Sequence, residues 1–268
     1  MLEWDLDGII IATPESLHVS QGIQACRRNI PILLEKPVAE NAEQGRELLV
    51  AARATGAKVL VGYILRHAGF MKTVKGLLVS GAIGTPVSFH IMLGAYETLV
   101  RSKSRFAPTD RNHLFGDYSH EWDYIHWFLG PIQAAVATSH QSGNLKLTQN
   151  PNIVDSILKL HNGITGTVHL DYVQRPGCRQ IRLIGDRGTI EIDAAKSVVT
   201  TRLYEEDFSR IFSFSENRDD AMEMQRDHFV DVIRNQAQEL VTLEESLQAV
   251  SVSDALIRSC STGTWQQV

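Results

Sequence analysis

The first part of the chain alternates short apolar runs with segments of helical spacing. Gly56 is placed to end one of these segments, and Ser16 is a plausible N-cap for another. Such alternation predicts a parallel sheet whose strands are connected by helices. The elements we expect here are strands at 8–12, 30–35 and 58–63 and helices at 16–28 and 41–55.

The pattern changes after about residue 66, where strands follow one another through short polar turns. Asn162-Gly163 and Asp186-Arg187-Gly188 are strong hairpin signals, so this part is predicted to be an α+β domain with a largely antiparallel sheet. We expect strands at 87–93, 134–138, 154–160, 165–173, 178–185 and 188–193, helices at 70–80, 117–129, 221–235 and 243–259, and a loop over 97–112.

Composition narrows the class of protein. The 268 residues are 43% hydrophobic, enough for one large or two moderate cores. A net charge of -5 argues against a dominant nucleic-acid surface. The three cysteines lie far apart without metal-ligand spacing, so we expect no metal site and a reducing compartment. No apolar run is long enough to span a membrane. Together these features predict a cytoplasmic protein.

Polar groups follow the first two predicted strands. Thr13-Pro14 ends one strand and Glu35-Lys36-Pro37 ends the next. Because ligands bind beyond the carboxyl ends of parallel strands, both groups are expected to face one crevice. Lys36, between a carboxylate and a rigid proline, is the residue there best placed for chemistry. Tyr63 and Arg66 end the third strand and could border the same crevice, although a salt bridge explains Arg66 equally well.

A second chemical cluster falls in the predicted helix 117–129. His120 and Asp123 lie three residues apart and would share a face with Asp117. A histidine beside an aspartate suits proton transfer near neutral pH. The alternative is an amphipathic helix whose histidine and aspartates only make local hydrogen bonds.

These motifs together resemble the glucose–fructose oxidoreductase/inositol dehydrogenase (Gfo/Idh/MocA) superfamily of NAD(P)-dependent enzymes. That superfamily has a Rossmann strand ending in Ala-Thr-Pro, a nearby histidine, a later Glu-Lys-Pro, and a helix with His-x-x-Asp, and the resemblance extends nearly to the C-terminus. It implies a partial Rossmann-like domain at 1–66 and a substrate-binding and oligomerisation domain at 67–268.

The resemblance also implies roles for individual residues. Its catalytic set would be Lys36, His120 and Asp117, although Asp117 lies three residues before the histidine where the common motif has four. The Asp171 to Pro176 segment resembles a substrate-side segment of some relatives. Cofactor-binding residues would be Thr13, Pro14, His18, Glu35, Lys36 and Pro37, and substrate-binding residues would be Tyr63, Arg66 and Asp123.

One departure from the family affects the cofactor. No Gly-x-Gly-x-x-Gly occurs in the 268 residues, whereas this turn normally holds the pyrophosphate at a helix N-terminus. The chain therefore looks like a family member lacking the first half of its nucleotide-binding domain. We expect NAD or NADP as the cofactor, and weak or no binding of it to this chain alone.

The implied activity is hydride transfer at a secondary alcohol or carbonyl of a sugar, polyol or nucleotide sugar. The alternatives are a non-catalytic regulator that binds a sugar or nucleotide, and an oligomerisation module. Family members commonly pair through the open face of the second-domain sheet, so a homodimer or homotetramer is expected. No nucleic acid or membrane partner is predicted.

Overall fold

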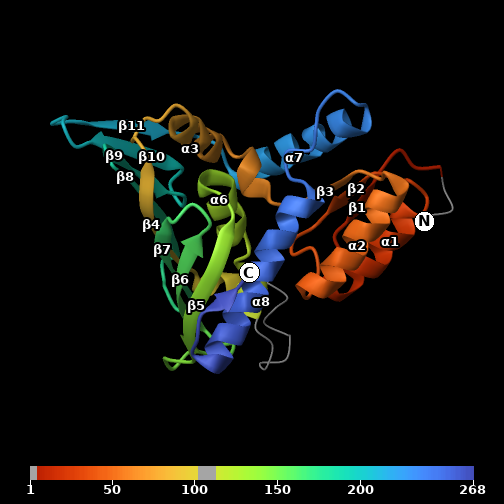
Figure 1. The fold of residues 1–268 in the computed structure, drawn as a ribbon, viewed down its shortest axis with the longest axis horizontal. Helices are drawn as coiled ribbons and strands as arrows, with labels where there is room; N and C mark the ends of the chain where they lie inside the picture. The colour runs from red at the N-terminus through yellow and green to blue at the C-terminus, as the bar shows by residue number, and fades with distance from the viewer. Residues whose placement is uncertain (1–4, 102–112) are drawn as a thin grey trace. The chain divides into compact units, whose positions relative to one another are not determined.

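The computed structural model describes residues 5–101 and 113–268, and its contacts divide the chain into two units (Figure 1). The sequence predicted one boundary, between 66 and 67. In the structure the first unit ends at Ala68 but also takes in two later segments, Ser119–Tyr124 and Asn217–Asp254. Residues far apart in the sequence therefore build the surroundings of the first sheet.

The first unit contains a parallel three-stranded sheet in the order β1-β2-β3. The strand and helix bounds are β1 Ile9–Ile11, β2 Ile32–Leu34, β3 Val59–Val61, α1 His18–Cys26 and α2 Ala42–Thr55. Asn41 caps α2 by accepting the N–H of Gln44, and Gly56 ends it in a left-handed conformation. Ser16 is not a helix cap, because it lies inside a 3-10 turn, Glu15–Leu17, that precedes α1.

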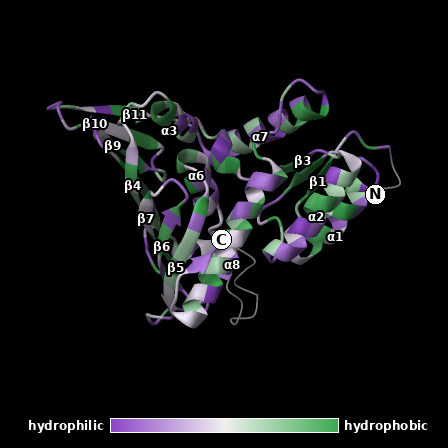
Figure 2. Ribbon diagram, viewed as in Figure 1, coloured by the Kyte–Doolittle hydropathy of each residue, from purple (hydrophilic) through white to green (hydrophobic). Residues whose placement is uncertain are grey.

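Helix α7, Arg218–Ile233, completes the apolar core of the first unit. Its Phe229 and Val232 are buried with Leu33 of β2 and Leu60 of β3. The three strands carry mainly hydrophobic residues, as Figure 2 shows. On the open edge of β3, Thr242 forms an isolated antiparallel bridge with Leu60. Thr242 immediately precedes α8, Leu243–Thr262.

The second unit contains a sheet of nine strands among the described residues, in the order β11-β10-β9-β8-β4-β7-β6-β5-β12. Only the β4–β7 pair is parallel within this sheet, so the prediction of a mostly antiparallel sheet is confirmed. The strands are β4 Pro86–Gly94, β5 Ile132–His140, β6 Ile153–Leu160, β7 Thr165–Asp171, β8 Cys178–Gly185, β9 Gly188–Asp193, β10 Val198–Leu203, β11 Ser209–Ser213 and β12 Gln266–Gln267.

Side chains along these strands alternate between a buried and an exposed face. In β6, Val154, Ser156 and Leu158 are buried while Asp155 and Ile157 are exposed. The buried face packs against helical segments, and the N–H of Ala137 on β5 donates to Ser259 in the C-terminal part of α8. Helix α3, Gly69–Val79, contacts β10.

Three predictions for the second part were wrong. Strands β10, β11 and β12 were missed. The expected loop at 97–112 starts within a helix, α4 Tyr96–Arg101, and the rest of it falls outside the described residues. The expected helix 117–129 is two helices, α5 His113–Asp117 and α6 His120–Leu129. The chain turns between them at Tyr118, whose buried hydroxyl donates to the carbonyl of Asp171.

Candidate active site

His18 ties together the loops that follow β1 and β2. It is buried, and its ring nitrogens lie 2.8 Å from the carbonyl oxygen of Pro37 and 2.9 Å from that of Thr13. The hydroxyl of Thr13 donates to Gln21 at 2.9 Å. Two loops held by one rigid imidazole have a fixed spacing, so the backbone just after Lys36 is anchored.

Glu35 and Lys36 lie at the carboxyl edge of the sheet. The Glu35 carboxylate accepts the Lys36 N–H at 3.2 Å. It also packs against Gly62, where an added Cβ would come within 3.2 Å of a carboxylate oxygen, tighter than nearly all real contacts. The strand ends are paired in register, Leu34 with Val61. Lys36 therefore lies two residues after the end of β2, and Tyr63 lies two residues after the end of the neighbouring parallel strand β3.

Tyr63 brings His120 to this edge. The two rings meet edge to face, with centroids 5.6 Å apart, and Tyr63 is fully buried. Burial, with the nearby charge of Asp123, raises the pKa of the Tyr63 hydroxyl. Tyr63 is therefore a neutral, rigid surface for His120 rather than an ionisable group of the site.

Arg66 and Asp123 form a buried ion pair. The guanidinium donates to both Asp123 oxygens, at 2.8 and 3.1 Å, and to Glu245 at 2.8 Å and the Leu240 carbonyl at 3.2 Å. Burial raises the pKa of Asp123 to about 6, against the opposing charge of Arg66, so the carboxylate is ionised at neutral pH. This pair fixes the first turn of α6, and with it the backbone of His120, to the end of β3.

Asp117 belongs to the second unit, where its neighbour is Tyr172. The Tyr172 hydroxyl donates to Asp117 Oδ2 at 2.6 Å. Tyr172 is completely buried, and burial together with the Asp117 charge raises the pKa of its hydroxyl well above the ordinary value. Asp117 ends α5 rather than lying on the helix of His120.

Asp171 and His169 form a charged pair beside Tyr172. Asp171 Oδ2 lies 3.1 Å from His169 Nε2, and the other ring nitrogen lies 2.7 Å from Asp155. The hydrogen bond to Asp171 raises the pKa of His169 to about 9. Burial disfavours a charged Asp171, but hydrogen bonds from His169 and Gln174 outweigh it and lower the pKa of Asp171 to about 2.

The structure thus distributes the predicted site residues over two places. In the first unit, Thr13, Pro14, His18, Glu35, Lys36, Pro37, Tyr63 and His120 lie at or next to the carboxyl edge of the sheet. Arg66 and Asp123 are buried against each other, which favours the salt-bridge alternative over substrate contact. The sequence analysis missed Glu245, because it lies far along the chain from Arg66 and no local motif links the two. It noted Tyr172 only as part of the Asp171 to Pro176 segment and assigned it no role.

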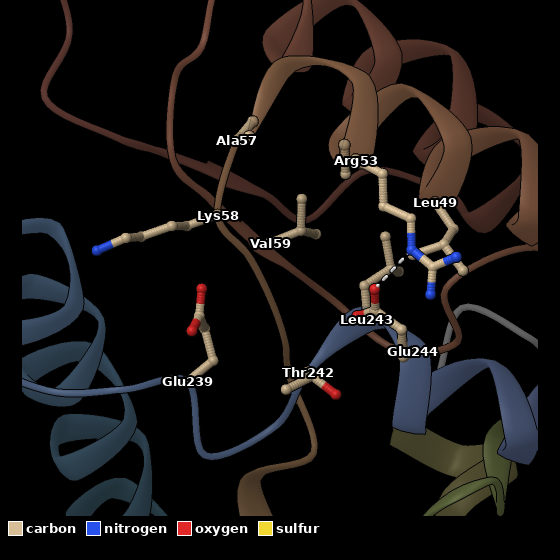
Figure 3. A pocket seen from close by; sticks show the side chains of 11 residues that line it. Leu49, Arg53, Ala57, Lys58, Val59, Glu239, Thr242, Leu243 and Glu244 are labelled. Atoms are coloured by element: carbon tan, nitrogen blue, oxygen red, sulfur yellow. Dashed lines mark hydrogen bonds and ion pairs between the residues drawn. The ribbon is translucent and has the colours of Figure 1, made fainter.

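A separate hollow of about 260 Å³ lies at the amino end of β3 (Figure 3). The ion pair of Arg53 with Glu244 borders it, and Lys58 binds the carbonyl of Val232. No residue predicted for the active site lines it. Among the described residues, no helix is long and apolar enough to cross a membrane, and no three His, Cys, Asp or Glu side chains are grouped as metal ligands.

Two family models match the chain. Residues 1–63 match the NAD-binding Rossmann fold of the Gfo/Idh/MocA oxidoreductase family. Residues 75–268 match the C-terminal alpha/beta domain of the same family.

Three proteins similar to this chain have names that state a metabolic role. The rhizopine catabolism protein MocA of Rhizobium meliloti is 24% identical over 94% of this chain and 75% of its own length. Inositol 2-dehydrogenase 4 of Saccharopolyspora erythraea is 29% identical over 51% of this chain, and 1,5-anhydro-D-fructose reductase of Ensifer adhaerens is 27% identical over 62%. These two matches span 39% and 50% of the respective relatives.

Solved structures share the fold at low identity. Levoglucosan dehydrogenase in complex with NADH and levoglucosan aligns with a TM-score of 0.85 at 17% identity, covering 98% of this chain and 80% of that one. An oxidoreductase from Agrobacterium radiobacter, in complex with NAD+, L-tartaric acid and magnesium, aligns with a TM-score of 0.88 at 18% identity, covering 99% and 81%.

Proposed function

The chain belongs to the Gfo/Idh/MocA oxidoreductase family, and from this premise we propose that it transfers hydride between NAD(P) and a sugar-like molecule. The reacting group would be a secondary alcohol or carbonyl of a sugar, polyol or nucleotide sugar. Relatives named as inositol dehydrogenase and anhydrofructose reductase support this substrate class.

The observation that carries the proposal is the presence of Lys36 and His120 at one edge of the parallel sheet. Lys36 follows β2, Tyr63 follows the adjacent β3, and His120 packs on Tyr63. A cation and a titratable base are the two groups that alcohol oxidation needs near one oxygen. We expect the side chains of Lys36 and His120 to approach within about 8 Å, a span that holds one substrate oxygen between groups at hydrogen-bonding range.

The groups at this edge fit the nicotinamide and ribose end of the cofactor. The Lys36 ammonium and the Glu35 carboxylate are polar partners suited to hydroxyl and amide groups. His18 holds the two flanking loops at a fixed spacing. A bound nicotinamide supplies the hydride chemistry, and the protein supplies position and charge.

His120 is proposed to accept the hydroxyl proton during oxidation and to return it during reduction. Lys36 would stabilise negative charge on the same oxygen. Asp117, a carboxylate three residues before His120, is the third member of the proposed catalytic set. Tyr63 and the Arg66–Asp123 pair would hold His120 in place at this edge.

The proposal is tested by measuring turnover of a panel of sugars and polyols at millimolar NAD+ or NADP+. The absorbance of the reduced nicotinamide reports the rate. We expect Lys36→Ala and His120→Ala each to lower kcat by about 100-fold or more, the usual contribution of a proton-transfer group. Lys72→Ala and His161→Ala, at exposed positions, are matched controls that should keep full turnover. Undiminished turnover in both site variants would refute the assignment. Ligand binding without any turnover would instead support a sugar-binding regulator.

We also propose that the chain forms a homodimer or higher homo-oligomer through the exposed face of the nine-stranded sheet. Met92 and Ile157 are exposed apolar side chains on this face. A shallow hollow lined in part by His90, Gln180 and Arg182 lies on it. An open sheet face of mixed polarity is the kind of surface that associates with a second copy.

A further inference from the structure

Tyr172 makes a direct hydrogen bond to a carboxylate of the proposed catalytic set. Its hydroxyl lies 2.6 Å from Asp117 Oδ2, a distance typical of the strong bonds that a hydroxyl makes to a charged oxygen. The phenol has no exposed surface. Among the described residues, Asp117 is the group to which this hydroxyl donates.

Hydrogen bonds hold the backbone on both sides of Tyr172. The Tyr172 N–H donates to the carbonyl of Asn152 at 2.9 Å. The preceding Asp171 accepts the N–H groups of Val173 and Gln174 through one carboxylate oxygen, at 2.6 and 2.8 Å. This turn fixes the direction in which the Tyr172 side chain leaves the strand.

The Asp171 carboxylate is itself secured by charge. His169, on the same strand, binds its second oxygen and is bound in turn by Asp155 of β6. The ring of Tyr172 also packs against Tyr118, with centroids 5.3 Å apart. Asp155, His169, Asp171 and Tyr172 thus form a connected series of contacts that ends at Asp117.

We propose that Tyr172 is the positioning residue of the Asp117 carboxylate, and that the Asp171–His169 pair holds Tyr172 in the required place. This role rests on the proposed function, because Asp117 matters for turnover only if the chain is an oxidoreductase. A carboxylate bonded at one oxygen to a rigid phenol is restrained in rotation. Such restraint preserves the geometry on which proximity effects depend.

Tyr172→Phe removes only the hydroxyl, and Tyr118→Phe is its matched control. Tyr118 is also buried and packs on the same ring, and the acceptors of its hydroxyl among the described residues are two backbone carbonyls and Thr98. We expect Tyr172→Phe to lower kcat by about 10- to 100-fold, the value of one hydrogen bond to a charged group. Tyr118→Phe should lose similar stability in urea and keep wild-type kcat. Equal kcat in the two variants would overturn the positioning role.

A second measurement is independent of turnover. Ultraviolet titration of the tyrosines in the intact chain identifies Tyr172 by the signal lost in Tyr172→Phe. Burial, together with the Asp117 charge and hydrogen bond, raises the pKa of Tyr172. Asp117→Asn removes the charge and keeps the burial, so it is expected to lower this pKa while leaving it above the ordinary value. An unchanged titration would show that the contact does not form and would overturn the proposal. Absence of turnover in the wild type, with the titration shifted as expected, would refute the proposed function but leave the Tyr172–Asp117 contact established.

Discussion

A single buried arginine joins three parts of the first unit. Arg66, after β3, binds Asp123 on α6 and Glu245 on α8, and Arg66 and Asp123 are almost fully inaccessible to solvent. A buried pair of this kind adds little net free energy to folding, because desolvation offsets attraction. Its effect is on orientation: a bidentate bond allows one placement of the helix turn that carries His120.

Arg66→Met should therefore lower the free energy of unfolding by about 3–5 kcal/mol, because it leaves Asp123 buried without a partner. Arg53→Met is the control, since the Arg53–Glu244 pair of the same unit is exposed and such pairs contribute about 1 kcal/mol or less. Urea denaturation measures both. If Arg66→Met cost no more than Arg53→Met, the pair would not be buried as described.

His169 gives the chain a pH-dependent stability above neutrality. Its pKa of about 9 in the folded chain exceeds the ordinary 6.5. The charged ring therefore stabilises the fold fully below pH 6.5, and this contribution is lost as the pH rises through 9. The pKa of Asp171, about 2 against an ordinary 3.8, gives a contribution present above pH 3.8 and lost as the pH falls through 2.

Replacing His169 by Gln should reduce the fall in the urea midpoint between pH 6.5 and pH 9, the window set by the two pKa values of His169. His140→Gln, at an exposed position on β5, should leave the wild-type pH dependence in place. Histidine resonances in a proton NMR titration give the pKa directly. A value near 6.5 for His169 would contradict the pairing.

Residues at strand ends could be located from sequence, whereas contacts between distant segments could not. Lys36 follows the end of its own strand, and the neighbouring strand is parallel. Its position at the carboxyl edge of the sheet could therefore be predicted. The Tyr172–Asp117 bond depends on the register of the large sheet and on a turn at Tyr118. The Arg66–Glu245 bond joins the third strand to the start of the last helix. Neither pair has a local sequence signal.

Helices were foreseen where capping residues mark their ends, and strands where polar and apolar residues alternate. Helix α2 begins after Asn41, whose side chain caps its first turn, and ends at Gly56, whose lack of a Cβ permits the left-handed conformation there. Strand β11 is mostly exposed along its length, and β10 places Thr201 at a buried position. In β10 two valines are followed by two threonines, so both faces carry the same residue types, and in β11 the apolar residues Ile211 and Phe212 are adjacent. Neither strand therefore shows the period-two alternation on which recognition depends.

Two glycines in helical segments should respond in opposite ways to alanine. Gly56 has a φ of +74° at the end of α2, so Gly56→Ala should cost about 1 kcal/mol through backbone strain. Gly76 lies exposed within α3, and a Cβ there meets no atom within 4 Å, so Gly76→Ala should stabilise the chain by about 0.5–1 kcal/mol. Thermal or urea unfolding of the two variants checks the signs, and a shared sign would contradict the helix-end assignment.

At the scale of the whole molecule, the exposed face of the large sheet determines the expected association. Ile157→Arg introduces a charge on that face and should convert the proposed oligomer to monomer in light scattering. Val50→Arg on α2 changes an even more exposed apolar residue that is not part of this sheet, and the oligomer should persist. A wild-type chain that stays monomeric over a wide concentration range would refute the association.

The central position of β4 has a consequence for how the chain acquires its structure during synthesis. Strands β5, β6 and β7 form one set of strands that pair in sequence order, and β8 to β11 form another. Strand β4 lies between the two sets, where its Ser88 pairs with Thr165 of β7 and with Ile184 of β8. Closing such long loops is slow. On the ribosome β4 emerges well before either partner, leaving Phe89, Ile91 and Leu93, all buried in the finished sheet, without cover. We therefore expect this apolar strand to stay exposed on the nascent chain until β7 and β8 have been made, which favours its protection by a chaperone.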